Sequence, residues 1–132
     1  GKEKKSALDG IAPALPALSQ AQEYQSRAAR FGFEWPDLSM VFEKVQEEIE
    51  EIKQAEDAQQ REQEIGDLFS AATNLARFYQ VDAESALRES NNRFKKRFGY
   101  IEGQAEAQGR QLSELSLDEM LHLWREAKQL GY

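Results

Sequence analysis

The stretch VFEKVQEEIEEI, residues 41–52, decides the fold class because its apolar residues recur at helical spacing. Val41, Val45, Ile49 and Ile52 lie three or four positions apart, so they form one stripe on a helix. Four glutamates fall between them within five positions: Glu47, Glu48, Glu50 and Glu51. The stretch therefore predicts an amphipathic helix. It leaves open whether the glutamates form a solvated face or hold a cation.

Helical spacing continues on both sides of this stretch. We expect helices over 17–31, 38–57 and 61–79, a fourth from Asp82, a fifth from Ser116, and a looser segment over 103–115. Gly32 and Pro36 interrupt the chain between the first two helices. The sequence SLDE at the start of the last helix fits a capping box. Without any alternating strand pattern, the predicted fold class is all-α, an antiparallel helical bundle.

The length of 132 residues suits one compact domain. We expect a flexible lead-in over 1–16 and a single all-α domain over 17–132. The chain has no cysteine and one histidine, which excludes disulfides and thiolate metal sites and leaves little material for histidine chemistry. No run reaches the ~18 apolar residues of a membrane span, and no secretory segment is visible. The expectation is a cytoplasmic protein with no membrane partner.

The net charge of −7 is concentrated in one part of the chain. Residues 43–67 contain ten acidic and three basic residues, and the rest of the chain balances to zero. An acidic pocket that needs cations has this pattern, whereas a surface built for solubility spreads its charge. A protein that binds nucleic-acid backbone needs a basic stripe instead. We therefore expect no nucleic-acid partner.

Carboxylates on two successive predicted helices have spacing that suits a metal site. Glu48 and Glu51 are three positions apart, and Glu47 and Glu51 are four apart, so they are neighbours on one helix face. Glu64 and Asp67 repeat the three-residue spacing on the next helix, which a short connection makes an antiparallel neighbour. Ligands that are all oxygen suit Mg²⁺ or Mn²⁺. EExxE followed by ExxD predicts a divalent-metal site, with a solvated face as the alternative.

A magnesium site of this type usually binds substrate phosphates, which need cationic side chains elsewhere. In NNRFKKRF, Arg93 and Arg97 are four positions apart on one helix face. Each planar guanidinium group can donate two parallel hydrogen bonds to a phosphate. The alternative is intramolecular ion pairing to the acidic helices. Trp124 and Lys128 have the same spacing. Trp124 fits either a base-stacking platform or a core residue, and Lys128 either binds substrate or is a plain surface charge.

These motifs occur together in a recognisable order. The sequence contains, in turn, GFEWPD, KVQEEIEEI, EIGDLFSAATNLARF, DAESALRESNNRFKKRFGYIE and LHLWREAK. In this order and spacing, from about Ser6 to about Lys128, the chain resembles the MazG family of nucleoside triphosphate pyrophosphohydrolases. It looks most like the C-terminal catalytic domain of the two-domain bacterial members.

The resemblance implies an all-α bundle that works as a homodimer or higher homo-oligomer. It implies Mg²⁺-dependent hydrolysis of nucleoside triphosphates to monophosphate and pyrophosphate, with Mn²⁺ as a substitute and a broad substrate range. The implied metal ligands are Glu48, Glu51, Glu64 and Asp67, with Glu47 supporting the cluster or positioning water. The implied substrate-binding residues are Asn74, Asn91, Arg93, Arg97, Trp124 and Lys128.

One position departs from some relatives, which carry a lysine where this chain has Gln60. The departure affects one phosphate contact and leaves the metal ligands in place. Two other functions stay open. One is a non-enzymatic helical module whose acidic face docks a basic partner without Mg²⁺. The other is a narrow-substrate relative, such as a dUTPase-like or phosphoribosyl-ATP pyrophosphohydrolase.

Overall fold

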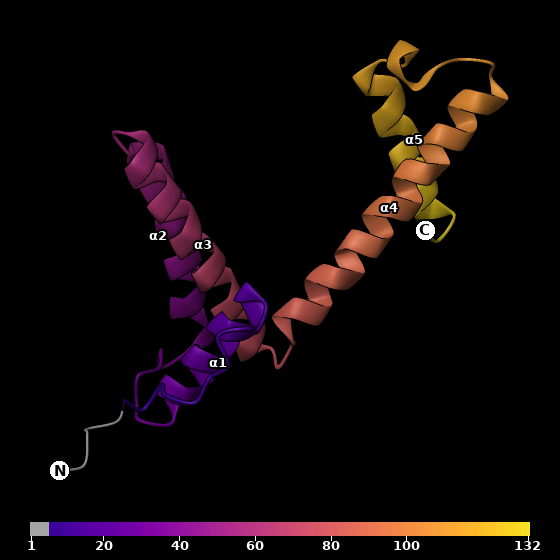
Figure 1. Ribbon diagram of the computed structural model, residues 1–132. Coiled ribbons are helices and arrows are strands. Elements are labelled where there is room, and N and C mark those ends of the chain that lie inside the picture. Colours follow the sequence, from indigo (N-terminus) through magenta and orange to yellow (C-terminus); the bar gives the residue numbers. More distant parts are fainter. Residues whose placement is uncertain (1–5) are drawn as a thin grey trace. The chain divides into compact units, whose positions relative to one another are not determined.

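A computed structural model describes residues 6–132, and every regular element in that range is a helix (Figure 1). The elements are α1 (Ala17–Ala29), α2 (Leu38–Gln54), α3 (Ala58–Phe78), α4 (Ala83–Ala107), the short 3₁₀ helix η1 (Leu112–Glu114) and α5 (Leu117–Gln129). The predicted all-α class is confirmed for this range. Residues 1–5 of the predicted lead-in lie outside the described residues. None of the described helices is both long and apolar enough to cross a membrane.

The chain divides into two compact units, Gly1–Ala86 and Leu87–Tyr132, here called the N-terminal unit and the C-terminal unit. The N-terminal unit contains α1, α2 and α3. The C-terminal unit contains most of α4, η1 and α5.

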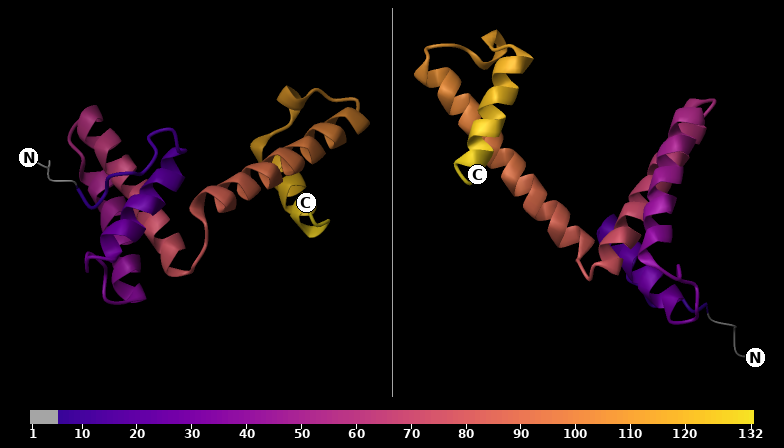
Figure 2. Two further views of the ribbon diagram at one scale, coloured as in Figure 1. Left: turned by 60° about the horizontal axis from the view of Figure 1, so that its bottom comes forward. Right: turned by 180° about the vertical axis from the view of Figure 1, so that it is seen from behind.

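In the N-terminal unit, α3 packs against both α1 and α2. Only residues 55–57 connect α2 to α3, so the two helices run antiparallel, side by side in Figures 1 and 2. Each begins at an aspartate cap: Asp37 accepts a hydrogen bond from the Met40 amide at 3.1 Å, and Asp57 from the Gln60 amide at 2.7 Å. These caps set where each helix starts.

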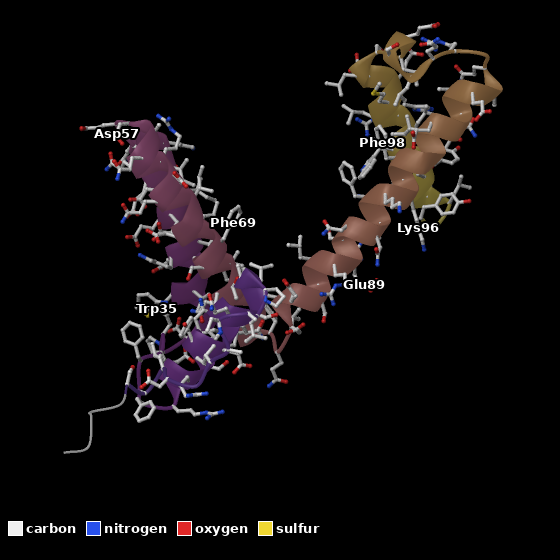
Figure 3. All side chains as sticks on the ribbon, in the orientation of Figure 1. Trp35, Asp57, Phe69, Glu89, Lys96 and Phe98 are labelled. Carbon is white, nitrogen blue, oxygen red and sulfur yellow. The ribbon has the colours of Figure 1, made fainter. Side chains whose placement is uncertain are left out.

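The apolar stripes of α2 and α3 are only partly covered within this chain. Val41 is buried, but Phe42 and Ile49 of α2 are 42% and 41% exposed. On α3, Ile65 is 37% exposed and Phe69 60% exposed, and Phe69 projects from the helix in Figure 3. The helical periodicity therefore predicted the helices correctly, but the apolar residues that repeat along them are not all buried. The described residues of the N-terminal unit therefore do not fully cover an apolar face of α2 and α3.

The described part of the predicted lead-in contacts α1. Arg27 donates hydrogen bonds from Nη1 to the carbonyl oxygens of Ala7 and Asp9, at 3.2 and 2.9 Å. Gln22, also on α1, accepts from the Ala83 amide at 2.8 Å and so links α1 to the start of α4.

In the C-terminal unit, α4 and α5 enclose a small core. Its buried residues are Ile101, Ala105, Leu115 and Leu123, with Phe98, Tyr100, Leu112, Met120 and Trp124 packed around them. The expectation of a looser segment from residue 103 is wrong at its start, because α4 continues through Gly103 to Ala107. Burial of Ile101 and Ala105 on either side of Gly103 outweighs the ~1 kcal/mol that glycine costs in a helix. The helix ends instead before Gly109, whose φ of 67° is a left-handed terminating conformation.

The start of α5 is the predicted capping box. Ser116 accepts from the Glu119 amide through Oγ, and Glu119 accepts from the Ser116 amide through Oε1, both at 3.1 Å. Arg110 also donates to Glu119, at 2.5 Å from Nη1 to Oε2. This hydrogen bond from Arg110, together with that from the Ser116 amide, lowers the pKa of Glu119 to about 2.

We expect Ser116→Ala to lower the free energy of unfolding by ~1 kcal/mol, because it removes the acceptor for one otherwise unpaired amide. Urea denaturation followed by circular dichroism measures the change. Ser113→Ala is the matched control, since Ser113 is an exposed residue of η1 and its loss should change stability by less than ~0.5 kcal/mol. Equal effects at both serines would contradict a stabilising role for the cap.

Candidate functional site

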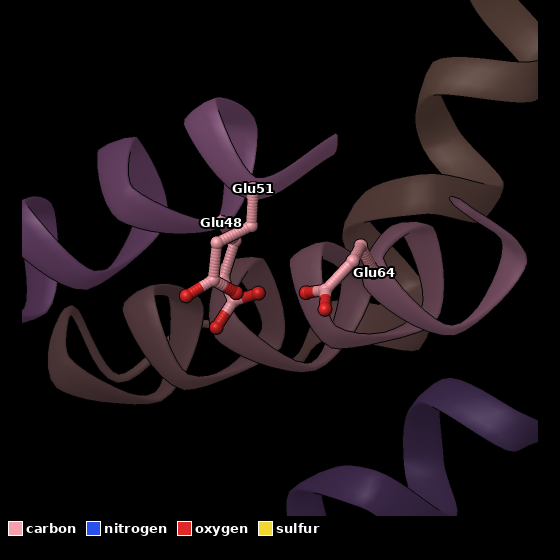
Figure 4. A group of neighbouring side chains, drawn as sticks. All are labelled: Glu48, Glu51 and Glu64. Carbon is pink, nitrogen blue, oxygen red and sulfur yellow. The ribbon is translucent and has the colours of Figure 1, made fainter. Parts of the chain in front are cut away.

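Three carboxylates from two helices point toward one another in the N-terminal unit (Figure 4). Glu48 and Glu51 lie one turn apart on α2, and Glu64 lies on α3. One carboxylate oxygen from each residue lies within 4.8 Å of the other two. A Mg²⁺ ion with bonds of ~2.1 Å holds its ligands at most ~4.2 Å apart. Small side-chain rotations would therefore close this group on one ion.

Two of these carboxylates contain an oxygen without a hydrogen-bond partner. Glu48 is only 3% exposed. Within residues 6–132, Oε2 of Glu48 and Oε2 of Glu64 are buried and find no donor. A buried carboxylate oxygen without a partner is costly. A cation bound between α2 and α3 would satisfy both atoms, so the residues present fit a divalent metal.

Lys44 lies one turn before Glu48 and partly balances the cluster. Its Nζ is 3.0 Å from Oε1 of Glu48 and 3.5 Å from Oε1 of Glu47. Burial opposes the charged form of Glu48, but hydrogen bonds from Lys44 and within the carboxylate group leave its pKa below the ordinary value. The pKa of Glu51 moves the other way, to about 7, because Glu64 and Glu48 lie beside it. Below about pH 7 the group therefore keeps a proton that a metal would displace.

A cavity of about 650 Å³ adjoins the carboxylates. Glu48 and Asp67 line it, as do Asn74 and Arg77 further along α3. The remaining walls come from α1, from α2, from the loop between them, from other residues of α3, and from Leu8 before α1. Its volume lies within the range of small-molecule sites. The cavity can therefore hold a ligand of nucleoside size next to the acidic group.

The remaining predicted residues of the N-terminal unit have different surroundings. Asp67 lies outside the group of three carboxylates but lines the same cavity as Glu48, and its role as a fourth ligand stays a prediction. Asn74 also lines the cavity, and its Oδ1 accepts from Nε and Nη2 of Arg77 at 3.1 and 2.8 Å. Glu47 is exposed and lies near Lys44.

The other predicted substrate-binding residues belong to the C-terminal unit: Asn91, Arg93, Arg97, Trp124 and Lys128. Arg97 donates from Nε to the Tyr132 carbonyl at 2.9 Å, and its Cζ lies 5.5 Å from the centre of the Trp124 ring. Trp124 also meets the Phe94 ring edge-on, at 5.2 Å between centres. Trp124 thus packs against the core of its unit, which agrees with the expectation that it is a core residue. Stacking of Trp124 on a nucleotide base stays a prediction.

Among the residues at the site that reasoning from sequence missed are Lys44, Glu34 and Arg77. Lys44 has a local signal, because it lies four positions before Glu48. Glu34 and Arg77 form an ion pair of 2.5 Å across 43 positions. No local pattern could have paired them, because the contact depends on how the loop before α2 lies against α3.

Comparison with known proteins gives a relationship over nearly the whole chain. No family model matches. The chain is 42% identical over 128 residues to a protein of Thermotoga maritima named nucleoside triphosphate pyrophosphohydrolase/pyrophosphatase MazG, covering 97% of this chain and 50% of that protein. It is 41% identical over 133 residues to the nucleoside triphosphate pyrophosphohydrolase of Escherichia coli K12, covering 97% of this chain and 51% of that protein.

A shorter similarity reaches the Bacillus subtilis protein YabN, whose name leaves it uncharacterised, at 46% identity over 66 residues, 50% of this chain and 14% of that protein. The chain spans about half the length of the first two relatives. With 41–42% identity to these two proteins across 97% of its residues, the resemblance of the chain to the MazG family is confirmed over nearly its whole length.

Proposed function

We propose that this chain hydrolyses nucleoside triphosphates to nucleoside monophosphate and pyrophosphate at the carboxylate group of α2 and α3. The observation that carries the proposal is the pair of buried oxygens, on Glu48 and Glu64, that find no donor among residues 6–132. The names of the relatives from T. maritima and E. coli support the reaction.

Glu48, Glu51 and Glu64 would hold Mg²⁺, or Mn²⁺ as a substitute, with Asp67 as a fourth ligand. When bound, the metal neutralises charge on the triphosphate and lowers the pKa of a water molecule. Glu47, which is exposed and lies near Lys44, would support the cluster or position a water molecule for attack on the α-phosphorus. Lys44 balances the negative charge of Glu47 and Glu48.

We place the nucleoside in the adjoining cavity. Glu48 and Asp67 line it beside the aromatic residues Phe33 and Trp35, so one ligand could meet both the acidic and the apolar part. Aromatic walls recognise the face of a base, which every base has, and this favours a broad substrate range. A broad substrate range suits an enzyme that clears surplus or non-standard nucleotides. We propose that it does so in the cytoplasm, without a membrane or nucleic-acid partner.

Arg93 and Arg97 would bind the phosphates. Trp124, Lys128, Asn91 and Asn74 would be further contacts to the substrate. We expect Arg97→Ala to weaken binding of a non-hydrolysable triphosphate by ~10-fold or more, because a charge-assisted hydrogen bond is lost. Binding of the monophosphate should change less. Calorimetric titration with Mg²⁺ measures both, and Lys96→Ala is the control because Lys96 is an exposed residue of the same helix. Equal losses for the two ligands would rule out the role given to Arg97.

We also propose that a second copy of the chain covers the uncovered apolar face of α2 and α3, since Phe42 and Phe69 are too exposed for an apolar stripe. The resemblance implies the same homodimer. Sedimentation should then give at least twice the chain mass of 15.1 kDa.

Product analysis tests the proposed reaction. The protein is incubated with canonical and damaged nucleoside triphosphates, with Mg²⁺ and separately with EDTA. Monophosphate and pyrophosphate, formed only with Mg²⁺, are the expected products. Diphosphate and phosphate would mean that a different bond is cleaved. No turnover with any substrate would favour the acidic docking module, and turnover of a single nucleotide would favour a narrow-substrate enzyme.

A further inference from the structure

The loop between α1 and α2 presents aromatic side chains that core packing does not hold. Phe33 is 82% exposed and Trp35 38% exposed, yet both line the cavity (Trp35 is labelled in Figure 3). Gly32, beside Phe33, has a φ of 90°, a turn conformation that glycine adopts without strain. A loop of this kind needs another contact to fix its aromatic residues as a wall.

Glu34 supplies that contact from within the loop. Its Oε1 accepts from the Trp35 amide at 3.2 Å and from Nη2 of Arg77 at 2.5 Å. One carboxylate oxygen therefore joins the loop backbone at Trp35 to a side chain of α3. The side chains of Glu34 and Arg77 are 30% and 17% exposed, so the pair is screened less than an open surface pair.

Arg77 is itself held in place on α3. Its guanidinium donates twice to Oδ1 of Asn74, and its Cζ lies 5.2 Å from the centre of the Phe78 ring. These contacts use several nitrogen atoms of the planar guanidinium group at once. A lysine, with a single ammonium nitrogen, could not reproduce all of them. The fixed point is thus α3, the helix that also contributes Glu64 to the carboxylate group.

We propose that Arg77 is a positioning residue that, through Glu34, holds Phe33 and Trp35 as the wall of the cavity against which the substrate's base stacks. This rests on the proposed function and deepens it, because it assigns recognition of the base to the loop and recognition of the phosphates to other residues. The ligand class is a nucleoside triphosphate whose aromatic base enters the cavity.

The test compares Arg77→Met with the unaltered chain on the nucleoside triphosphate that it hydrolyses best. We expect KM to rise by ~10-fold, the size of a partly lost base-stacking contact, with kcat changed by less than ~2-fold. Inorganic tripolyphosphate, which has no base, serves as a competitive inhibitor. Its inhibition constant should stay unchanged, because Arg77 acts only on the base. Arg77→Lys should give a KM between those of the unaltered chain and Arg77→Met. Arg30→Met, at an exposed position at the end of α1, should leave both KM and kcat unchanged.

Glu34→Ala tests the same contact from the loop and does not depend on the folding of Arg77→Met. It should raise KM by the same factor, and the double variant should show no additional loss. An unchanged KM in both single variants would overturn the inference. So would equal weakening of tripolyphosphate and nucleotide, because that result means a general disturbance of the site. Absence of turnover in the unaltered chain would instead refute the proposed function itself.

Discussion

Glu48→Gln should lower kcat by ~100-fold or more while the helical content stays unchanged. Glu48 is the most buried of the three clustered carboxylates, and it contacts Lys44 while facing Glu51 and Glu64. The amide keeps the shape of the side chain but removes the charge that would hold a cation where charge develops in the reaction. Steady-state hydrolysis with excess Mg²⁺ measures the loss, and circular dichroism checks the fold.

Glu50→Gln is the matched control for this prediction. Glu50 lies on the same helix, is exposed, and pairs with Lys53 at 3.2 Å rather than with the cluster. Its replacement should leave kcat within ~2-fold, as expected for a surface change. Full activity in Glu48→Gln, or equal losses in both variants, would mean that the reaction does not occur at this cluster.

Raising the pH from 4.5 to about 7 should destabilise the metal-free protein, and Mg²⁺ should remove this effect. The neighbours Glu64 and Glu48 raise the pKa of Glu51 in the folded chain from 4.5 to about 7. Below pH 4.5 Glu51 is protonated in both states, and its stabilising contribution is present in full. Between the two values the unfolded chain releases the proton that the folded chain keeps, so stability falls as the pH rises.

Thermal unfolding at several pH values, in EDTA and in Mg²⁺, measures this dependence. Glu51→Gln should flatten the profile in EDTA and raise Tm near pH 7, since it removes the repulsion, while hydrolysis is lost. In the unaltered chain, Mg²⁺ at ~100 times its Kd should stabilise the folded state by ~2.7 kcal/mol. A profile in EDTA that is the same for Glu51→Gln and for the control Glu50→Gln would contradict the assignment.

Local sequence was enough to predict the helices and the starts of all but α3, which begins at Ala58 rather than at residue 61. The aspartate and serine caps act within three or four residues, and the apolar spacing repeats at every turn, so both are visible without knowledge of the fold. The same holds for the spacing of Glu48 with Glu51 and of Glu64 with Asp67. The expected loosening at residue 103 was wrong because glycine's weak helix propensity was outweighed by burial of its neighbours.

The sequence by itself therefore determined an all-α chain with carboxylates of metal-ligand type on two adjacent helices. Only the tertiary structure decided which oxygens meet: those of Glu48, Glu51 and Glu64 form one group, while Asp67 lines the cavity beside it. It also decided that Glu34 meets Arg77. The physical reason is that contacts within a helix follow from its pitch, whereas contacts between elements depend on how helices pack and rotate against each other. That packing is the sum of many side-chain contacts distant in sequence, and no local pattern contains it.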